Sequence, residues 1–285
     1  MEEKNIPVEV QEEYLQAYLK VMNLWGLEHH SEEIENSWGT THINICGSKD
    51  NHPLLLLHAA SINSAQWYAN VKAWSKHFRL ITVDTLGDCG WSRPNQDLEN
   101  KTQYNKWLVD LIDQLGLDKP HILGHDYGGW LAMNLAISNP EILDKMVLLA
   151  PAASIIPLNL STKINWKMSA LPFISPLSKT SRLISKNDLV EKEFLELLDA
   201  AKRSCKSKIL YPSVFSDLEL LNISNPTLLL IGDQDKMYSP LKAVNRAREF
   251  IPNLKSEIII NTGHFLNLEQ PEVVNSKVIN FLKSD

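Results

Sequence analysis

The sequence lacks the features that would tie a protein to nucleic acid, a membrane or a metal ion. Its 285 residues contain three cysteines and carry a formal net charge of −6. An acidic balance disfavours nucleic acid and anionic membranes as partners, and no run approaches the roughly 18 apolar residues of a membrane span. No Cys/His cluster has the spacing of metal ligands, and neither a Gly-x-Gly-x-x-Gly loop nor a P-loop is present. We therefore expect no metal, no cofactor, no nucleic-acid partner and no membrane partner.

The cysteines and the N-terminus bear on the cellular compartment. Cys46, Cys89 and Cys205 have no Cys-x-x-Cys spacing, and their odd number argues against a disulfide framework. The first five residues lack the apolar segment of a secretory signal peptide. These observations favour a soluble, cytoplasmic protein. Hydrophobic residues make up 44% of the chain, which is enough for one substantial core with or without an inserted subdomain.

Most of the chain alternates between short apolar runs and helical patterns. Apolar runs typical of strands lie at residues 41–45, 53–57, 79–84, 121–123, 145–149, 226–231 and 256–260. Patterns typical of helices lie at residues 64–77, 100–116, 130–137, 240–250 and 271–282. Strands that alternate with helices of this length predict βαβ units, and therefore a mostly parallel sheet flanked by helices.

Two segments stand outside this alternation. Residues 10–26 have apolar side chains at helical spacing, and they form a helix that packs on the core or presents a stripe to a partner. Residues 151–222 have a helical pattern that prolines interrupt, which indicates a helical cap inserted into the core. The basic run at residues 202–208 is typical of a solvated helix face rather than an anion site. The predicted organisation is a core of residues 1–150 and 223–285 with a cap at 151–222.

One short motif, Gly-His-Asp-Tyr-Gly-Gly at residues 124–129, carries most of the functional information. An apolar run precedes it and a helical pattern follows it, which is the strand–turn–helix context of a nucleophile elbow. Glycines two residues before and two residues after the central position are needed because a Cβ there would collide with the neighbouring strand and helix. The central residue is Asp126 rather than serine.

Later motifs add an acid and a base in a fixed order. A late strand ends in Gly-Asp-Gln-Asp at residues 232–235, and Gly-His-Phe follows the last strand at residues 263–265. With these three motifs the chain resembles an α/β-hydrolase over residues 38–283, because nucleophile, acid and histidine occur in that family's order. The resemblance implies that Asp235 orients His264, with Asp233 as the rival acid, and that the N–H groups of Ala60 and Tyr127 form an oxyanion hole.

An aspartate at the elbow favours particular chemistry. A carboxylate can open an epoxide or displace a halide, leaving an alkyl ester on Asp126 that water activated by His264 hydrolyses. Attack on a carboxylic ester would give a high-energy anhydride instead. The elbow is similar to those of epoxide hydrolases, which predicts an epoxide hydrolase-like enzyme. The alternatives are a haloalkane dehalogenase-like enzyme, a carboxylesterase- or lactonase-like hydrolase, and a non-catalytic ligand-binding relative.

The resemblance also implies a pocket between cap and sheet for a small, largely apolar substrate. Its candidate binding residues are His58, Tyr211, Trp166 and Phe265, with Tyr211 as the candidate proton donor. Further candidate lining residues, each of which fits an ordinary core equally well, are Trp67, Trp91 and Trp130. Residues 87–92 resemble the family's Gly-x-Gly-x-Ser turn with one extra residue. Glu269 is expected to cap or brace the last helix.

Overall fold

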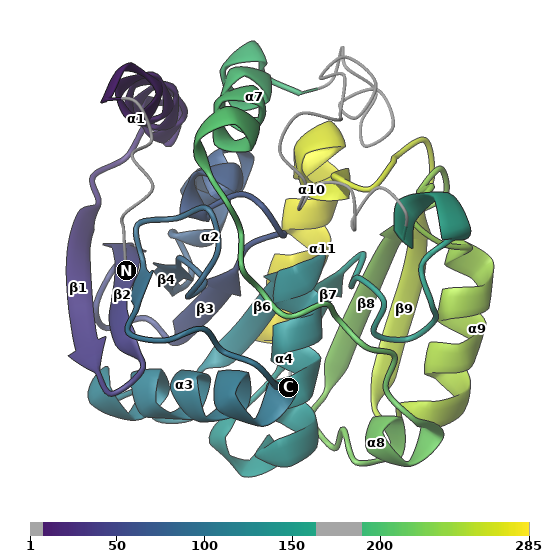
Figure 1. The fold of residues 1–285 in the computed structure, drawn as a ribbon. Coiled ribbons are helices and arrows are strands. Elements are labelled where there is room, and N and C mark those ends of the chain that lie inside the picture. Colours follow the sequence, from purple (N-terminus) through teal and green to yellow (C-terminus); the bar gives the residue numbers. More distant parts are fainter. Residues whose placement is uncertain (1–7, 164–189, 285) are drawn as a thin grey trace.

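The computed structural model describes residues 8–163 and 190–284, and a central sheet with helices on both faces dominates it (Figure 1). In these residues nine strands form one sheet. They are β1 (His30–Asn36), β2 (Gly39–Cys46), β3 (Pro53–Leu57), β4 (Arg79–Val83), β5 (Arg93–Pro94), β6 (His121–His125), β7 (Met146–Leu149), β8 (Thr227–Gly232) and β9 (Leu254–Ile259). The prediction of a mostly parallel sheet flanked by helices is confirmed.

The order of the strands brings the loops of interest together. The sheet runs β1-β2-β4-β3-β6-β7-β8-β9, and β5 pairs with β2 outside this path. Strand β2 is antiparallel to both β1 and β4, whereas every pair from β4 to β9 is parallel. The carboxyl ends of β3, β6, β8 and β9 therefore meet at one edge, which is where open parallel sheets bind ligands.

Alternation along the strands divides the core into two layers. In β3, Leu54 and Leu56 belong to one buried cluster, and Leu55 and Leu57 belong to the other. The helices on the first side are α1 (Val8–Asn23), α2 (Val71–Trp74), α7 (Lys192–Ser204), α10 (Leu266–Glu269) and α11 (Pro271–Lys283). Those on the second side are α3 (Lys101–Gln114), α4 (Tyr127–Ser138), α8 (Asp217–Leu221) and α9 (Pro240–Phe250).

Two elements depart from the pattern expected from the sequence. The helix expected at residues 64–77 is a 3-10 helix, η1 (Ser64–Ala69), followed by the short α2. The Asn63 side chain caps η1 by accepting from the Ala65 N–H, and the Asn70 side chain leaves the helix to bond Asn267 and Asn275. Strand β1 was not predicted because it is a mostly exposed edge strand with no apolar alternation. A further short 3-10 helix is η2 (Pro140–Ile142).

The N-terminal helix packs against its own chain. Its buried side chains are Tyr14, Ala17, Tyr18, Val21, Met22 and, just beyond the helix, Trp25. This face contacts α7 and η1, and its residues belong to the first core cluster. The apolar stripe is thus occupied within the chain, as the packing alternative expected.

Within the predicted cap the structure covers residues 151–163 and 190–222, which include α7, α8 and a helical stretch at residues 160–163. Arg203 and Lys208 pair with the carboxylates of Glu13 and Asp97 on the surface. These pairs agree with a solvated face for the basic run. The division into core and cap itself stays a prediction.

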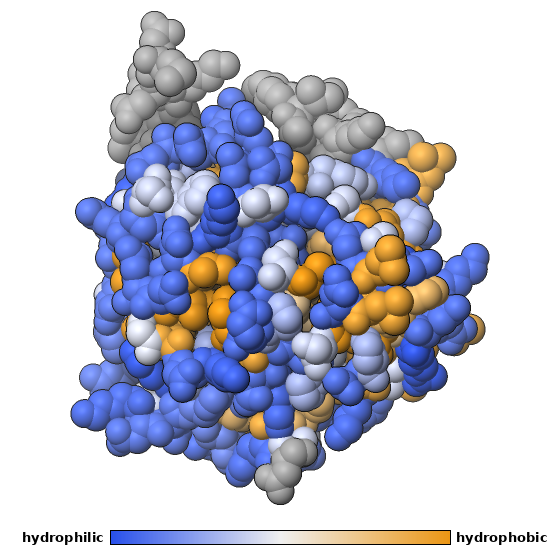
Figure 2. Space-filling model, turned by 90° about the horizontal axis from the view of Figure 1, so that it is seen from below, coloured by the Kyte–Doolittle hydropathy of each residue, from blue (hydrophilic) through white to orange (hydrophobic). Residues whose placement is uncertain are grey.

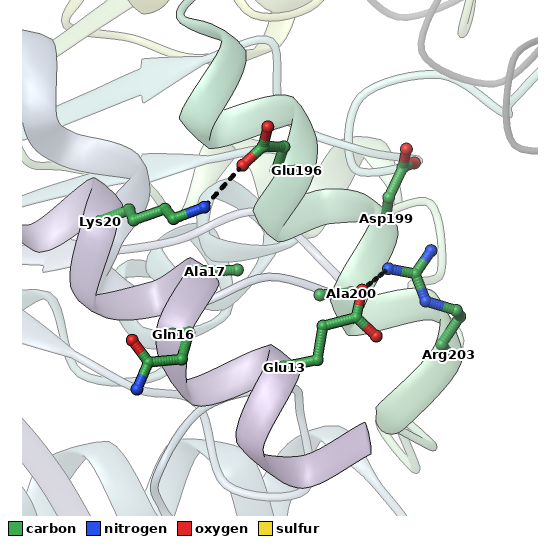
Figure 3. Close-up of a pocket in the computed structure, with 8 residues that line it drawn as sticks. All are labelled: Glu13, Gln16, Ala17, Lys20, Glu196, Asp199, Ala200 and Arg203. Carbon is green, nitrogen blue, oxygen red and sulfur yellow. Dashed lines mark hydrogen bonds and ion pairs between the residues drawn. The ribbon is translucent and has the colours of Figure 1, made fainter. Parts of the chain in front are cut away.

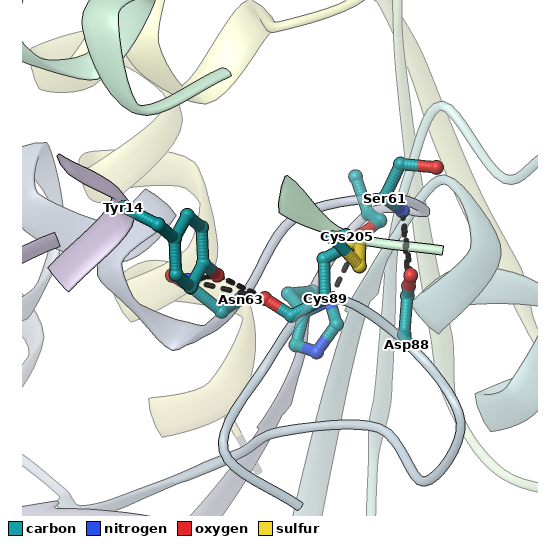
Figure 4. The surroundings of a disulfide bond; sticks show 8 residues. Tyr14, Ser61, Asn63, Asp88, Cys89 and Cys205 are labelled. Carbon is teal, nitrogen blue, oxygen red and sulfur yellow. Dashed lines mark hydrogen bonds between the residues drawn. A yellow bond between two sulfur atoms is a disulfide. The ribbon is translucent and has the colours of Figure 1, made fainter. Parts of the chain in front are cut away.

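A disulfide contradicts the expectation drawn from the odd number of cysteines. Cys89 and Cys205 are bonded, with their Cα atoms 5.6 Å apart (Figure 4). Cys46 is a buried free thiol. The carbonyl of Cys89 also accepts from the Tyr14 hydroxyl and from the Asn63 side chain. An odd count leaves one cysteine over but does not prevent the other two from pairing once the fold brings them together.

No helix within residues 8–163 and 190–284 is long and apolar enough to cross a membrane. Figure 2 views the molecule from below, at the end opposite α7, where hydrophilic residues dominate and hydrophobic residues form smaller patches between them.

Candidate active site

Asp126 lies at the turn between β6 and α4. Its backbone has φ 51° and ψ −113°, a strained conformation for a residue with a side chain. The flanking glycines make the turn possible. A Cβ on Gly124 would lie 2.2 Å from the carbonyl oxygen of Gly128, and a Cβ on Gly128 would lie 2.1 Å from that of Leu57. The turn directs the Asp126 side chain to the carboxyl edge of the sheet, as the motif predicts.

Three side chains from distant parts of the chain meet at this turn. His264 Nδ1 lies 2.8 Å from Asp235 Oδ2, and His264 Nε2 lies 3.3 Å from Asp126 Oδ1. All three residues are at least 94% buried. The longer contact does not have hydrogen-bond geometry, and neither of its atoms has another partner among the described residues. The three side chains thus have the arrangement of a nucleophile, a base and an acid. The contact between Asp126 and His264 is the longer of the two and is not a hydrogen bond.

The acid beside the histidine is Asp235 rather than Asp233. Asp235 also accepts from the Met237 N–H at 2.8 Å through its other oxygen, which fixes the carboxylate. Asp233 instead accepts from the Thr262 N–H at 3.2 Å and holds the loop that carries His264. The two carboxylates therefore have different structural roles.

The two carboxylates beside His264 favour its protonated form. Burial alone would lower the pKa of His264, but the carboxylates of Asp235 and Asp126 outweigh it and raise that pKa to about 10. Burial would raise the pKa of Asp126, but its contact with His264 outweighs burial and the pKa is lowered. At neutral pH the site thus holds an imidazolium between two carboxylates.

The loop after β3 supplies the candidate oxyanion hole. The Ala60 N–H donates to Asp126 Oδ2 at 3.1 Å. The N–H groups on either side of Ala60 also have partners. The Gln66 side chain accepts from the Ala59 N–H at 3.0 Å. Both oxygens of Asp88 accept from the Ser61 N–H at 3.0 Å (Figure 4). Both braces fix the direction of the Ala60 N–H.

The second expected donor of the oxyanion hole is the Tyr127 N–H. Tyr127 opens α4, and N–H groups in the first turn of a helix have no partner within the helix. Its role in the hole stays a prediction.

His58 has a structural position, contrary to its expected contact with substrate. Its ring is fully buried. Nδ1 lies 2.8 Å from the carbonyl oxygen of Ala59, and Nε2 accepts from the Thr85 N–H at 2.9 Å. Since both ring nitrogens are occupied by backbone groups, His58 braces two loops and has no polar atom free for a substrate.

The other candidate binding residues lie in different environments. Phe265 is buried and packs edge-on against His125 and Phe194, at centroid distances of 5.0 and 5.7 Å. Tyr211 is 39% exposed on the segment between α7 and α8, and its role as proton donor stays a prediction. Trp166 lies outside the described residues. Trp67 and Trp130 are fully buried core residues, and Trp91 packs against Tyr14 and Tyr18.

Two further residues support the loop that carries His264, and the sequence predicted this role for neither. His125 Nε2 lies 3.0 Å from the His264 carbonyl oxygen, and burial first, then the charge of His264, lowers the pKa of His125 to about 4. Neutral His125 therefore donates to this carbonyl. Glu269 accepts from the Gly263 N–H at 2.8 Å, so it braces the histidine loop, and its expected contact with the last helix stays a prediction. The position of His125 inside the elbow motif was the available signal.

A groove between α1 and α7 lies away from these residues. It encloses about 230 Å³ (Figure 3) and is lined by Glu13, Gln16, Ala17, Lys20, Glu196, Asp199, Ala200 and Arg203. Two ion pairs cross it, Lys20 with Glu196 and Arg203 with Glu13. It is a polar seam between two packed helices and contains none of the candidate catalytic residues.

Known proteins resemble the chain along nearly its whole length. Residues 54–277 match the Alpha/beta hydrolase family. The uncharacterized carboxylesterase nap of Bacillus subtilis (strain 168) is 31% identical, covering 95% of this chain and 93% of its own length. Carboxylesterase YbfK of the same organism is 32% identical, covering 94% and 93%. The crystal structure of naproxen esterase (carboxylesterase NP) from Bacillus subtilis has a TM-score of 0.92 at 30% identity, covering 98% of this chain and all of that one. The chain therefore belongs to the alpha/beta hydrolase family and has its fold.

Proposed function

We propose that the protein is a carboxylesterase-type hydrolase in which Asp126, His264 and Asp235 are the catalytic residues. The observation that carries the proposal is the Asp126 carboxylate, which faces His264 Nε2 at 3.3 Å beside the Ala60 N–H. The substrate class comes from the two carboxylesterases of 31% and 32% identity, which align with nearly the whole chain. This class was an alternative in the sequence analysis, which favoured epoxides.

The aspartate restricts which esters can react. Asp126 Oδ1 attacks the acyl carbon, the bond to the leaving oxygen breaks, and that oxygen takes the Nε2 proton of the His264 imidazolium. A mixed anhydride on Asp126 results. Its high energy means that only an acidic alcohol, such as a phenol, leaves readily. We therefore expect aryl esters to react faster than alkyl esters.

The second half of the reaction needs a neutral His264. Acylation removes the charge of Asp126, which is one of the two carboxylates that raise the pKa of His264. Having given up its proton, His264 can take a proton from water, whose oxygen attacks the anhydride. This step releases the carboxylic acid and restores both the Asp126 carboxylate and the imidazolium. Asp235 holds the ring and its charge throughout.

Epoxide opening is a second candidate, and one contact favours it. Asp126 Oδ2 already accepts from Ala60, whereas Oδ1 has no hydrogen bond among the described residues. In an alkyl ester formed through Oδ1, Oδ2 would occupy the site where an oxyanion is stabilised when water attacks Cγ. A substrate carbonyl in the ester route has to displace Oδ2 from this donor.

The test is a trapping experiment. His264→Gln is incubated with aryl esters, the matching alkyl esters and styrene oxide, and the intact protein is weighed and digested. An acyl adduct on Asp126, together with wild-type turnover of aryl esters, supports the proposal. An alkyl adduct from the epoxide replaces it with the second candidate. The absence of both adducts, with an inert wild type, overturns covalent hydrolysis at Asp126.

Two substitutions at the elbow serve as controls. Asp126→Asn has no nucleophile, and it should form no adduct in the His264→Gln background. Asp126→Ser places a hydroxyl beside His264, and a serine acyl ester is not a high-energy intermediate. If the scaffold is that of an esterase, this variant should cleave alkyl esters that the wild type leaves intact.

A further inference from the structure

We propose that His52, His121 and Asp144 form a binding site for a divalent transition-metal ion such as Zn²⁺, separate from the catalytic residues. One ligand atom from each of the three residues lies within 4.8 Å of those from the other two. His52 precedes β3, His121 opens β6, and Asp144 lies shortly before β7. Since these three strands are parallel neighbours, the cluster lies at their amino ends, whereas Asp126 lies at the carboxyl end of β6.

The spacing of the ligand atoms fits a small metal ion. His121 Nδ1 lies 3.3 Å from Asp144 Oδ2, and His52 Nε2 lies 3.9 Å from the same oxygen. Ligands about 2.0–2.1 Å from a tetrahedral zinc ion lie roughly 3.3 Å apart. The first pair already has this separation. His52 Nε2 would have to approach Asp144 more closely, and its side chain is partly exposed.

A buried ring nitrogen aimed at the carboxylate is the second, independent observation. His121 is 96% buried, yet its Nδ1 has no hydrogen-bond partner among the described residues. A buried polar atom without a partner is costly. Coordination of a metal ion would satisfy it. The ring of His121 is held by its packing against His52, at a centroid distance of 4.1 Å, and edge-on against Phe78 at 5.9 Å.

The charges around the cluster are compatible with a cation. His52 Nε2 donates to the carbonyl of Lys119 at 3.2 Å, and it would exchange this hydrogen bond for the ion. Lys145 is the neighbouring positive charge, and its ammonium group is held by the carbonyls of Leu282 and Ser284.

The donor set indicates the class of ion and its effect. Two imidazoles and one carboxylate suit zinc, nickel or copper, whereas magnesium prefers oxygen ligands alone. The ion would join three chain segments that each lead into a neighbouring strand. Because it binds the folded state, it should raise thermal stability as its concentration rises. These three residues are far apart in the chain and have no motif spacing, so local sequence patterns do not reveal the site.

Calorimetric titration of tag-free, EDTA-treated protein with Zn²⁺ tests the proposal. We expect one ion per chain in the wild type, no binding of Mg²⁺, and an affinity at least about tenfold weaker in His52→Gln and in Asp144→Asn. These two residues are partly exposed, so the variants should fold. A Zn²⁺-dependent rise of the melting temperature should be present in the wild type and absent from both variants.

Two controls separate this site from other histidines. His30→Gln removes an exposed histidine that lies 3.1 Å from Glu32 without a third ligand, and it should bind Zn²⁺ like the wild type. His264→Gln should also retain binding. If His264→Gln loses Zn²⁺ while His52→Gln and Asp144→Asn keep it, the ion binds at the catalytic residues and the proposal fails. Absence of binding below about 100 μM Zn²⁺ in the wild type, a concentration at which a site of this donor set should be filled, overturns it as well.

Discussion

His264 has two carboxylates in contact with its ring, and this decides the charge state of the site. A histidine that activates serine must be neutral before the reaction begins, whereas here the ring is protonated at rest. In the proposed reaction it first acts as an acid toward the leaving group and becomes a base only after Asp126 has reacted. The residue at the elbow therefore determines the order in which His264 gives and takes its proton.

The two aspartates after β8 can be separated by mutation. Asp235→Asn removes the charge beside His264 Nδ1, and we expect kcat to fall by about 10³–10⁴. Asp233→Asn is the matched control, because an asparagine oxygen can still accept from the Thr262 N–H. Steady-state kinetics of both variants check this. Equal losses in the two variants would show that the charge of Asp235 has no special role.

The charge on His264 also makes stability depend on pH. Its pKa is about 10 when folded and 6.5 in the unfolded chain, so its stabilising contribution is complete below pH 6.5 and is lost as the pH rises toward 10. Between pH 7 and 9 the free energy of unfolding should fall by about 1.4 kcal/mol per pH unit. Above pH 9 the buried Cys46 thiol, whose pKa burial raises to about 12, adds a further loss.

Urea unfolding of the wild type and of His264→Gln at pH 7, 8 and 9 measures this slope. The variant should show a flat profile over the same interval. A flat wild-type profile would mean that His264 is neutral in the folded protein, and that the proton it gives to the leaving group has another source.

At the scale of elements, the connection between β6 and α4 depends on close backbone contact with β3. The first turn of α4 passes so near to β3 that the Gly128 N–H donates to the His58 carbonyl at 3.0 Å. The same approach holds the loop after β3, the candidate oxyanion loop, beside Asp126. The turn at Asp126 and the packing of β6 beside β3 therefore both require a residue without a side chain at position 128.

Gly128→Ala tests this contact. The added Cβ would lie 2.1 Å from the Leu57 carbonyl oxygen, so we expect a loss of at least about 3 kcal/mol in the free energy of unfolding. Gly116→Ala is the control: it has φ 59° but no atom within 4 Å of the new Cβ, and it should cost about 1 kcal/mol. Equal effects of both substitutions, measured by urea unfolding, would contradict the argument from close approach.

At the scale of the whole molecule, the disulfide joins two distant parts of the chain. Cys89 follows β4 in the core, and Cys205 directly follows α7, so the bond closes a loop with a sequence separation of 116. It also lies beside Asp88, which braces the oxyanion loop through Ser61. Disulfides are rare in reducing compartments. The cytoplasmic location that the sequence suggests stays a prediction.

Breaking this disulfide should destabilise the entire fold. For a loop of this length we expect the free energy of unfolding to fall by about 2–4 kcal/mol on reduction. Urea unfolding with and without dithiothreitol measures the change. The double variant Cys89→Ser/Cys205→Ser should have the stability of the reduced wild type both with and without dithiothreitol. A wild type that is equally stable in both would show that the bond does not contribute.

The sequence by itself determined the sheet, the elbow and the order of Asp126, Asp235 and His264, because these depend on local patterns of apolar residues, glycines and short motifs. Only the tertiary structure decided which atoms meet. In the folded chain, both ring nitrogens of His58 contact backbone groups, and His125 and Glu269 contact the histidine loop. Cys89 is bonded to Cys205, and His52, His121 and Asp144 lie close together. Such contacts join residues far apart in the chain, and their partners depend on strand order and loop path, which no local pattern encodes.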